Sequence, residues 1–225
     1  MSQTASDYVR QHLMRNSNPA SGSPSAQLLL FQPSDCENLH TCMVSALYFL
    51  INRGRIKDLD MHILEDYMFK KEDKERFEVY KLINDIIDDK YNKISNRFSA
   101  EAETIKAVLY IVGRMKVTVS FTNIEGISQC LANGGAGFAV FYLRYQDSEK
   151  TTSHAVSFSA FAGNTILIFD SSFGIINVRL SELSNAFSLI TQCYNRIGFS
   201  QDGVSDNSPP SFYSIVPEYI ILSKC

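Results

Sequence analysis

The chain has 225 residues and a formal net charge of −3, with 45% hydrophobic and 20% charged residues. This length and balance predict a globular protein that buries a sizeable core in one domain. A net negative charge argues against a general nucleic-acid binder, which needs a concentrated basic face. No apolar run reaches the roughly 18–20 residues that cross a bilayer. We therefore expect no nucleic-acid partner and no transmembrane segment.

Five cysteines and four histidines are scattered along the chain. The odd number and wide spacing of the cysteines favour reduced thiols over a disulfide framework. No two cysteines have the close spacing of a structural zinc site, and the histidines do not cluster. The sequence therefore predicts neither a metal site nor a cofactor.

The N-terminal 27 residues include a polar stretch that is interrupted by Pro, Gly and Ser. Such a composition buries too little apolar surface to order itself. We interpret residues 1–27 as a flexible segment and residues 28–225 as one folded domain. A start rich in Ser, Asn and Thr, without a cleavable signal, is also typical of type III secretion signals.

A nearly uninterrupted apolar run follows Thr41 and ends near Gly54. Almost no position from Cys42 to Ile51 is charged, which predicts a helix that is buried on all sides. Thr41 can cap this helix and Gly54 can stop it. Cys42 then lies in the first turn, where free N–H groups and the positive end of the helix dipole favour a thiolate.

Helical periodicity dominates the next part of the chain, and the period changes to that of strands after Lys116. In the expected helix at 72–93, one apolar face should point toward the core. Its residues are Phe77, Tyr80, Ile83, Ile86 and Ile87. Short connections make the middle strands an antiparallel meander, and Pro217 suits an edge or bulge. Helices first and antiparallel strands second predict the α+β class. The expected helices are 60–69, 72–93, 100–114, 124–133 and 180–194, and the expected strands are 117–121, 138–145, 154–161, 165–170, 213–216 and 219–222.

Two titratable residues lie at the ends of neighbouring strands of this meander. With a turn at 162–164, pairing is roughly symmetric about the turn, which brings His154 and Asp170 to the same end of the sheet. A carboxylate there can fix the imidazole tautomer and leave the other nitrogen for a thiol. Each residue alone has an ordinary structural explanation. The agreement of a cysteine at a helix start with this pair favours a catalytic site.

Three segments, Thr41–Leu47, Ser153–Val156 and Ile166–Ser171, resemble the motifs of papain-like cysteine proteases. The resemblance is strongest to compact type III effectors, namely the YopT-type proteases and the small effectors that cut Rab GTPases. It implies a papain-like fold in which a buried nucleophile helix packs on a C-terminal antiparallel sheet. It also implies Cys42 as nucleophile, His154 as general base and acid, and Asp170 as the orienting residue.

The oxyanion donor and the nucleophile leave alternatives open. Cys36 stands where papain-like enzymes often have a glutamine, so Asn38 is our preferred oxyanion-hole residue and Gln32 the alternative. Cys36 is also the rival nucleophile, if a helix begins earlier. Cys42 is preferred because the apolar run begins directly after it.

Three functions are compatible with these residues. The leading hypothesis is a monomeric cysteine protease, secreted through a type III system into the host cell cytoplasm, that cleaves a host protein such as a small GTPase. The second is a glutamine deamidase or transglutaminase that uses the same triad, because a side-chain amide needs the same groups as a backbone amide. The third is an inactive papain-like binding module.

Overall fold

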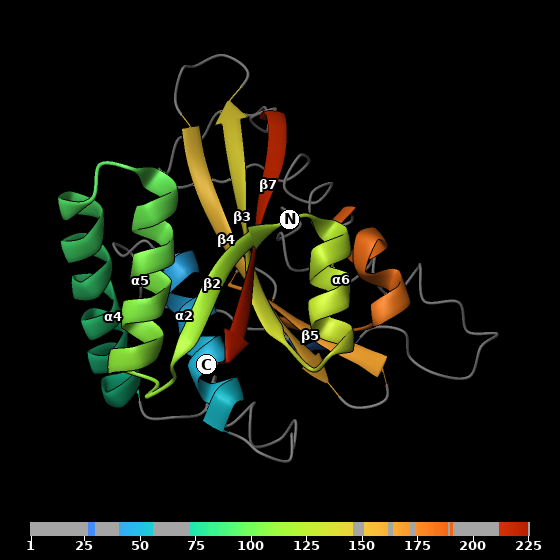
Figure 1. The fold of residues 1–225 in the computed structure, drawn as a ribbon, viewed down its shortest axis with the longest axis horizontal. Helices are drawn as coiled ribbons and strands as arrows, with labels where there is room; N and C mark the ends of the chain where they lie inside the picture. Colours follow the sequence, from blue (N-terminus) through green and yellow to red (C-terminus); the bar gives the residue numbers. More distant parts are fainter. Residues whose placement is uncertain are drawn as a thin grey trace, which may run out of the picture.

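The computed structural model describes residues 27–29, 41–55, 73–145, 151–161, 164–171, 174–188, 190 and 212–224. Helices and strands follow one another as the α+β prediction requires, with most helices before the antiparallel strands (Figure 1). The helices are α2 (Thr41–Arg55), α4 (Asp73–Lys93), α5 (Arg97–Ile111) and α6 (Ile124–Ala132). The strands are β1 (Gln27–Leu29), β2 (Val117–Thr122), β3 (Ala136–Tyr145), β4 (Thr151–Phe161), β5 (Thr165–Asp170), β6 (Gly174–Arg179) and β7 (Phe212–Lys224).

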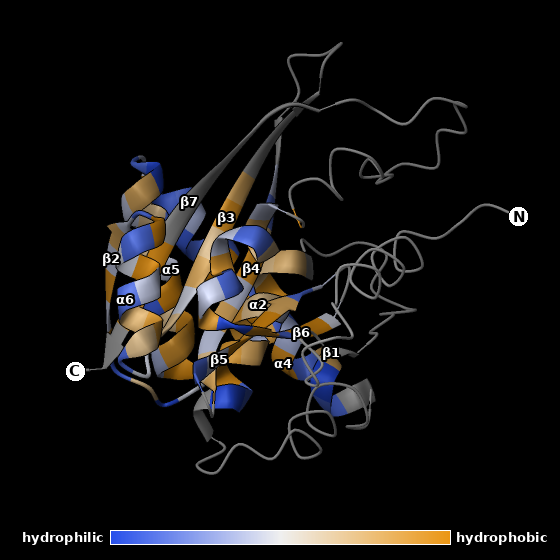
Figure 2. Ribbon diagram, turned by 90° about the vertical axis from the view of Figure 1, so that its right-hand side faces the viewer, coloured by the Kyte–Doolittle hydropathy of each residue, from blue (hydrophilic) through white to orange (hydrophobic). Residues whose placement is uncertain are grey.

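The strands form one antiparallel sheet in the order β1-β6-β5-β4-β3-β7-β2 over the described residues. Its centre, β3-β4-β5, is the predicted meander, so this prediction is confirmed. In Figure 1, α4 and α5 lie on one side of the sheet and α6 on the other. Apolar residues gather where the helices meet the sheet (Figure 2).

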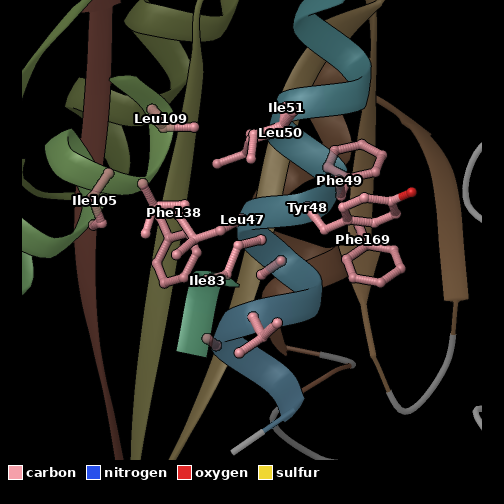
Figure 3. Close-up of a cluster of buried hydrophobic side chains, with 14 of the residues drawn as sticks. Leu47, Tyr48, Phe49, Leu50, Ile51, Ile83, Ile105, Leu109, Phe138 and Phe169 are labelled. Carbon is pink, nitrogen blue, oxygen red and sulfur yellow. The ribbon is translucent and has the colours of Figure 1, made fainter. Parts of the chain in front are cut away.

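Helix α2 lies at the centre of the larger hydrophobic cluster. Every residue from Val44 to Asn52 is buried, as expected for a helix that is covered on all sides. Phe49 stacks on Phe169 of β5, with ring centroids 5.3 Å apart, and Leu47 points toward Phe138 of β3 (Figure 3). Gly54 does not stop the helix, which continues to Arg55.

The face of β4 toward α2 consists mainly of small residues, with Phe161 at its end. Side chains alternate along a strand, so Ala155, Ser157 and Ser159 share the face on which α2 packs, and all three are buried. Small side chains let the helix backbone approach the strand backbone. At the other end of this contact, Arg53 Nη2 donates a hydrogen bond to the Ala160 carbonyl at 2.9 Å.

Two parts of the sheet were missed by the sequence analysis, namely β1 and β6. The position of Pro217 also differs from the prediction. It lies inside the single strand β7 and not between two strands. It pairs with Phe141 of β3, while β2 reaches only Tyr219 on the other side. At Pro217 the second edge of β7 therefore has no described partner strand, and the missing N–H is tolerated there.

The helix predictions need three corrections. Tyr80, Ile83 and Ile87 are buried as expected, but Phe77 is 51% exposed because it lies one turn before the part of α4 that packs on its neighbours. Helix α5 begins earlier than predicted, since the Asn96 side chain caps it by accepting from the Ser99 N–H at 3.0 Å. The segment after β6 starts as a 3₁₀ turn at 180–182, before helical residues 183–188.

Several predictions fall outside the described residues. These are the helix at 60–69, the end of the helix at 180–194, and the N-terminal segment apart from Gln27, which begins β1. Among the residues that are described, no helix is long and apolar enough to cross a membrane.

Candidate active site

The nucleophile candidate lies where helix α2 begins. The helix starts at Thr41, so Cys42 occupies its first turn as predicted, and its residue is partly exposed while the following turns are buried. Unsatisfied N–H groups and the helix dipole concentrate positive potential at this position. The backbone N–H of Met43 donates a hydrogen bond to the sulfur.

His154 and Asp170 lie on adjacent strands and touch. The register pairs Asp170 with Val156, so His154 is its diagonal neighbour on the same face of the sheet. The His154 Nε2 and the Asp170 Oδ1 are 3.1 Å apart, and both side chains are at least 96% buried. The two side chains therefore meet as predicted. Asp170 is paired with Val156, which is two residues along β4 from His154.

Cys42 reaches the same place through an unpaired edge of β4. Strand β5 pairs only with residues 156–161, so the described part of β4 before Val156 has no β5 partner. The Cys42 sulfur occupies this edge, 3.9 Å from the Ser153 carbonyl, and it accepts from the Ala155 N–H. A further hydrogen bond joins the Cys42 thiol to the His154 side chain. Because Nε2 faces Asp170, Nδ1 is the nitrogen left for the sulfur.

The electrostatics favour charge separation between the sulfur and the imidazole. Burial raises the pKa of Cys42, but the hydrogen bond and the charge of His154, helped by two backbone N–H groups, outweigh it and leave this pKa lowered. Burial lowers the pKa of His154, yet the charge and hydrogen bond of Asp170, followed by those of Cys42, raise it to about 10. Between the two pKa values the pair is thiolate and imidazolium, which is the reactive form of a cysteine nucleophile.

The remaining site predictions cannot be placed. Asn38, Gln32 and the rival nucleophile Cys36 lie outside the described residues. Cys130 is in the last turn of α6 and its sulfur is 3.7 Å from the Ala136 carbonyl. Within the described ranges, no group of three His, Cys, Asp or Glu residues is arranged to hold a metal ion.

The backbone groups that surround the sulfur were not predicted from the sequence. The Ser153 carbonyl and the Ala155 N–H point to the same edge of β4, since they are two residues apart. Their availability depends on where β5 stops. The signal in the sequence is the position of Asp170, directly before Ser171-Ser172-Phe173-Gly174, a composition that favours a turn. Strand β5 ends at Asp170, two residues short of His154.

A comparison with solved structures identifies a similar fold. The avirulence protein AvrPphB of Pseudomonas superposes with a TM-score of 0.52 and 14% sequence identity, over 82% of this chain and 92% of that one. No family model matches this sequence. No curated protein matches it significantly either. The likeness is one of fold, and it agrees with a mixed arrangement of helices and antiparallel sheet.

Proposed function

We propose that this chain is a papain-like cysteine protease in which Cys42 is the nucleophile, His154 the general base and acid, and Asp170 the orienting residue. One observation carries the proposal. A hydrogen-bonded sequence runs from the thiol through the imidazole to the carboxylate, with 3.1 Å between His154 and Asp170. A nucleophile, its base and an orienter within hydrogen-bond reach are the requirements of covalent acyl transfer.

The reaction follows from the positions of these groups. The Cys42 thiolate attacks the carbonyl carbon of the substrate amide, and the C–N bond breaks as the His154 imidazolium gives its proton to the leaving amine. Water then attacks the thioester while His154 takes a proton from it, and the acid product leaves as the sulfur is released. The oxyanion would be held by the Cys42 backbone N–H and the Asn38 side chain.

In this mechanism the two ring nitrogens of His154 have different partners. Asp170 holds Nε2, which fixes the ring with Nδ1 toward the sulfur. Its negative charge stabilises the imidazolium in the buried site, where an unpaired cation would be unfavourable. Asp170 thereby acts on the sulfur without touching it, by keeping the neighbouring imidazole charged.

The biological setting of the proposal is a bacterial effector. The Pseudomonas structure with the similar fold is named an avirulence protein, and this supports delivery of the chain, through a type III system, into a host cell. The substrate is then a host protein, for which a small GTPase is our candidate. The catalytic domain is 28–225, after a secretion segment at 1–27.

Labelling with iodoacetamide at mildly acid pH tests the nucleophile. Peptide mapping should find Cys42 modified well before the other four cysteines, because only a thiolate reacts at that pH. Preferential labelling of Cys36 would move the nucleophile to that position. Equal, slow labelling of all five cysteines would remove the proposal.

Mass spectrometry of host lysate treated with the enzyme tests the reaction. A protease creates new protein N-termini that are absent after treatment with Cys42→Ala. A deamidase instead adds about one dalton to a glutamine without cleavage, using the same groups. If Cys42→Ala and the wild type had identical cellular effects, the inactive binding module would be the correct description.

A further inference from the structure

The described sheet ends at β1 on one side and at β2 on the other. Strand β1 has only three residues, and a short edge strand is one of the ways in which proteins protect a sheet edge. Strand β2 pairs with β7 through all six of its residues, in an unbroken register. Its second edge has no partner strand within the described ranges, and α5 and α6 lie on the two faces of the sheet (Figure 1). The sheet can therefore be extended at β2.

The amino acids of β2 do not protect this edge. The segment Val117–Thr122 contains no charged residue, no Pro and no Gly, and most of its residues are of types that favour strands. None of them is buried, whereas Phe138 to Phe141 of β3 are all buried. Ser120 and Phe121 are exposed. Natural proteins rarely leave an edge of this kind to water, because it is a template for pairing with another chain.

An exposed aromatic pair lies beside the same edge. Phe121 of β2 and Phe98 at the start of α5 contact each other edge to face, with ring centroids 5.2 Å apart. Their side chains are 41% and 49% exposed. Phe121 shares a face of β2 with Val119, which packs on the larger hydrophobic cluster. A strand added at this edge would cover part of the aromatic surface and so gain more than backbone hydrogen bonds.

Charged residues at the two ends of β2 have opposite signs. Arg114 and Lys116 precede the strand, Glu125 follows it in the first turn of α6, and all three are exposed. An antiparallel neighbour matches this order if it carries basic residues before its own strand and an acidic residue after it. A second copy of β2 has that order, so antiparallel alignment brings each basic end to the acidic end of the other copy. Parallel alignment would bring like charges together.

We propose that two copies of this chain associate through β2, as antiparallel neighbours related by a two-fold axis at Ser120, and form one continuous sheet. The axis places Ser120 of one copy opposite Ser120 of the other, and Phe121 opposite Val119 on the same face. Counting outward along the strands, Lys116 of one copy then lies next to Glu125 of the other. Strands β3 and β7 separate β2 from β4, so this interface does not use the candidate active site. The chain is then a dimer and not the monomer expected from its sequence.

Sedimentation velocity of the full chain at increasing concentration tests the inference. One strand pair with two aromatic pairs is a small interface, so we expect a monomer–dimer equilibrium with a dissociation constant of about 10–100 μM. Ser120→Lys should weaken association about tenfold or more, because it sets two like charges against each other at the axis. Ser184→Lys makes the same change at an exposed position of the helical segment 183–188, and it should leave association unchanged. Thermal unfolding in dilute solution shows that both variants are folded.

Exchange of the charges at the strand ends tests the antiparallel alignment. Lys116→Glu and Glu125→Lys should each weaken association about two- to fivefold, because each brings like charges together at both ends of the interface. The double variant restores opposite charges and should associate like the wild type. A loss in the double variant equal to the product of the two single losses would contradict this alignment.

Ser120→Cys tests the position of the axis. Directly opposed residues of an antiparallel pair have Cα atoms about 4.5–5.5 Å apart, a separation that a disulfide can bridge. Under mild oxidation this variant should form a covalent dimer, and the mapped peptide should join position 120 to itself. Ser184→Cys, oxidised in parallel, should form no such dimer.

Four results would overturn the inference. The first is a chain that stays monomeric up to about 500 μM, beyond the range of a weak but specific interface. The second is self-association that Ser120→Lys does not change, and the third is the absence of the disulfide at position 120. The fourth is a monomeric chain that retains a host protein unless Ser120→Lys is present. In that case the β2 edge accepts a strand from a different protein.

Discussion

Cys42 and Cys130 are both partly exposed thiols near a helix end and near a backbone carbonyl, yet their pKa values move in opposite directions. The pKa of Cys42 is lowered, whereas burial raises the pKa of Cys130. Cys42 is in the first turn of its helix and Cys130 in the last, so the helix dipole favours a thiolate only at Cys42. The second difference is the imidazole of His154, which is hydrogen-bonded to Cys42, whereas the sulfur of Cys130 lies against the backbone carbonyl of Ala136. Partial burial does not decide reactivity; the sign of the surrounding potential does.

Removing each sulfur in turn is the strongest test of this comparison. Cys42→Ala should reduce amide hydrolysis by a factor of about 10³ or more, since a nucleophile cannot be replaced by its neighbours. Cys130→Ala should keep activity within about twofold, because its thiol packs at the end of α6. The measurement is cleavage of a host protein found in the lysate experiment. Loss of activity in Cys130→Ala, in a variant with unchanged thermal stability, would contradict the contrast.

The pH dependence of alkylation should differ almost as much between the two cysteines. Raising the pH through the lowered pKa of Cys42 forms the thiolate, and the imidazolium persists until the pH approaches about 10. Labelling of Cys42 should therefore reach its plateau at a lower pH than the labelling of an ordinary thiol. The rate for Cys130 should instead rise about 100-fold from pH 6 to pH 8, because each unit below a thiol pKa lowers the thiolate fraction tenfold. Parallel profiles of the two peptides in mass spectrometry would show that His154 does not act on Cys42.

Asp170→Ala should make the labelling of Cys42 more like that of Cys130. Without the carboxylate, the pKa of His154 falls, and the thiolate loses its positive neighbour. We expect labelling of Cys42 at pH 6 to slow by about 10- to 100-fold, and the buried imidazole to destabilise the fold by about 1–3 kcal/mol. Asp170→Asn keeps a hydrogen-bond acceptor and should lose less. Unchanged labelling in Asp170→Ala would leave the carboxylate with a structural role alone.

The His154–Asp170 ion pair should also make the stability of the fold depend on pH. The pKa of His154 is raised in the folded chain, so its contribution is fully present below the unfolded value of about 6.5 and is lost as the pH rises through about 10. Denaturation by urea at pH 7 and pH 10.5 should show a larger loss of stability in the wild type than in His154→Ala. Equal losses would assign the alkaline destabilisation to other groups.

The smallest effect is expected from the packing between α2 and β4. Ser157 is fully buried, and its hydroxyl has no hydrogen-bond partner within the described residues. Ser157→Ala should be neutral or slightly stabilising, within about 1 kcal/mol. Ser157→Leu should push α2 away and cost about 1–3 kcal/mol. It should also slow labelling of Cys42 but not of Cys130, which peptide mapping can resolve.

Helices and the meander could be predicted because their signals are local. The charge-free run after Thr41 is long enough to require burial on all sides, and counting outward from the turn at 162–164 brought His154 and Asp170 together. Asp170 lies seven residues after position 163 and Val156 seven before it, so the same count also agrees with the observed pairing of Asp170 with Val156 and with the two-residue offset of His154.

The parts that could not be predicted depend on contacts between distant segments. Strand β6 lacks the alternation of a half-buried strand, because Ile175, Ile176 and Val178 are all buried. Phe77 follows the apolar spacing of α4 and is nevertheless exposed, since nothing in the spacing tells how far along the helix its neighbours reach. The environment of Cys42 likewise depends on the unequal lengths of two neighbouring strands.

Because of that inequality, access to the Cys42 sulfur depends on where the β5–β6 hairpin ends. Gly174 pairs with Asp170 and has a φ of 99°, a conformation that side chains rarely adopt, so the chain reverses at this point. A longer β5–β6 hairpin would bring its added residues opposite Ala155 and His154 and cover the edge that the sulfur occupies. Insertion of a residue pair in this hairpin should thus block access to the Cys42 sulfur without altering the Cys42, His154 or Asp170 side chains.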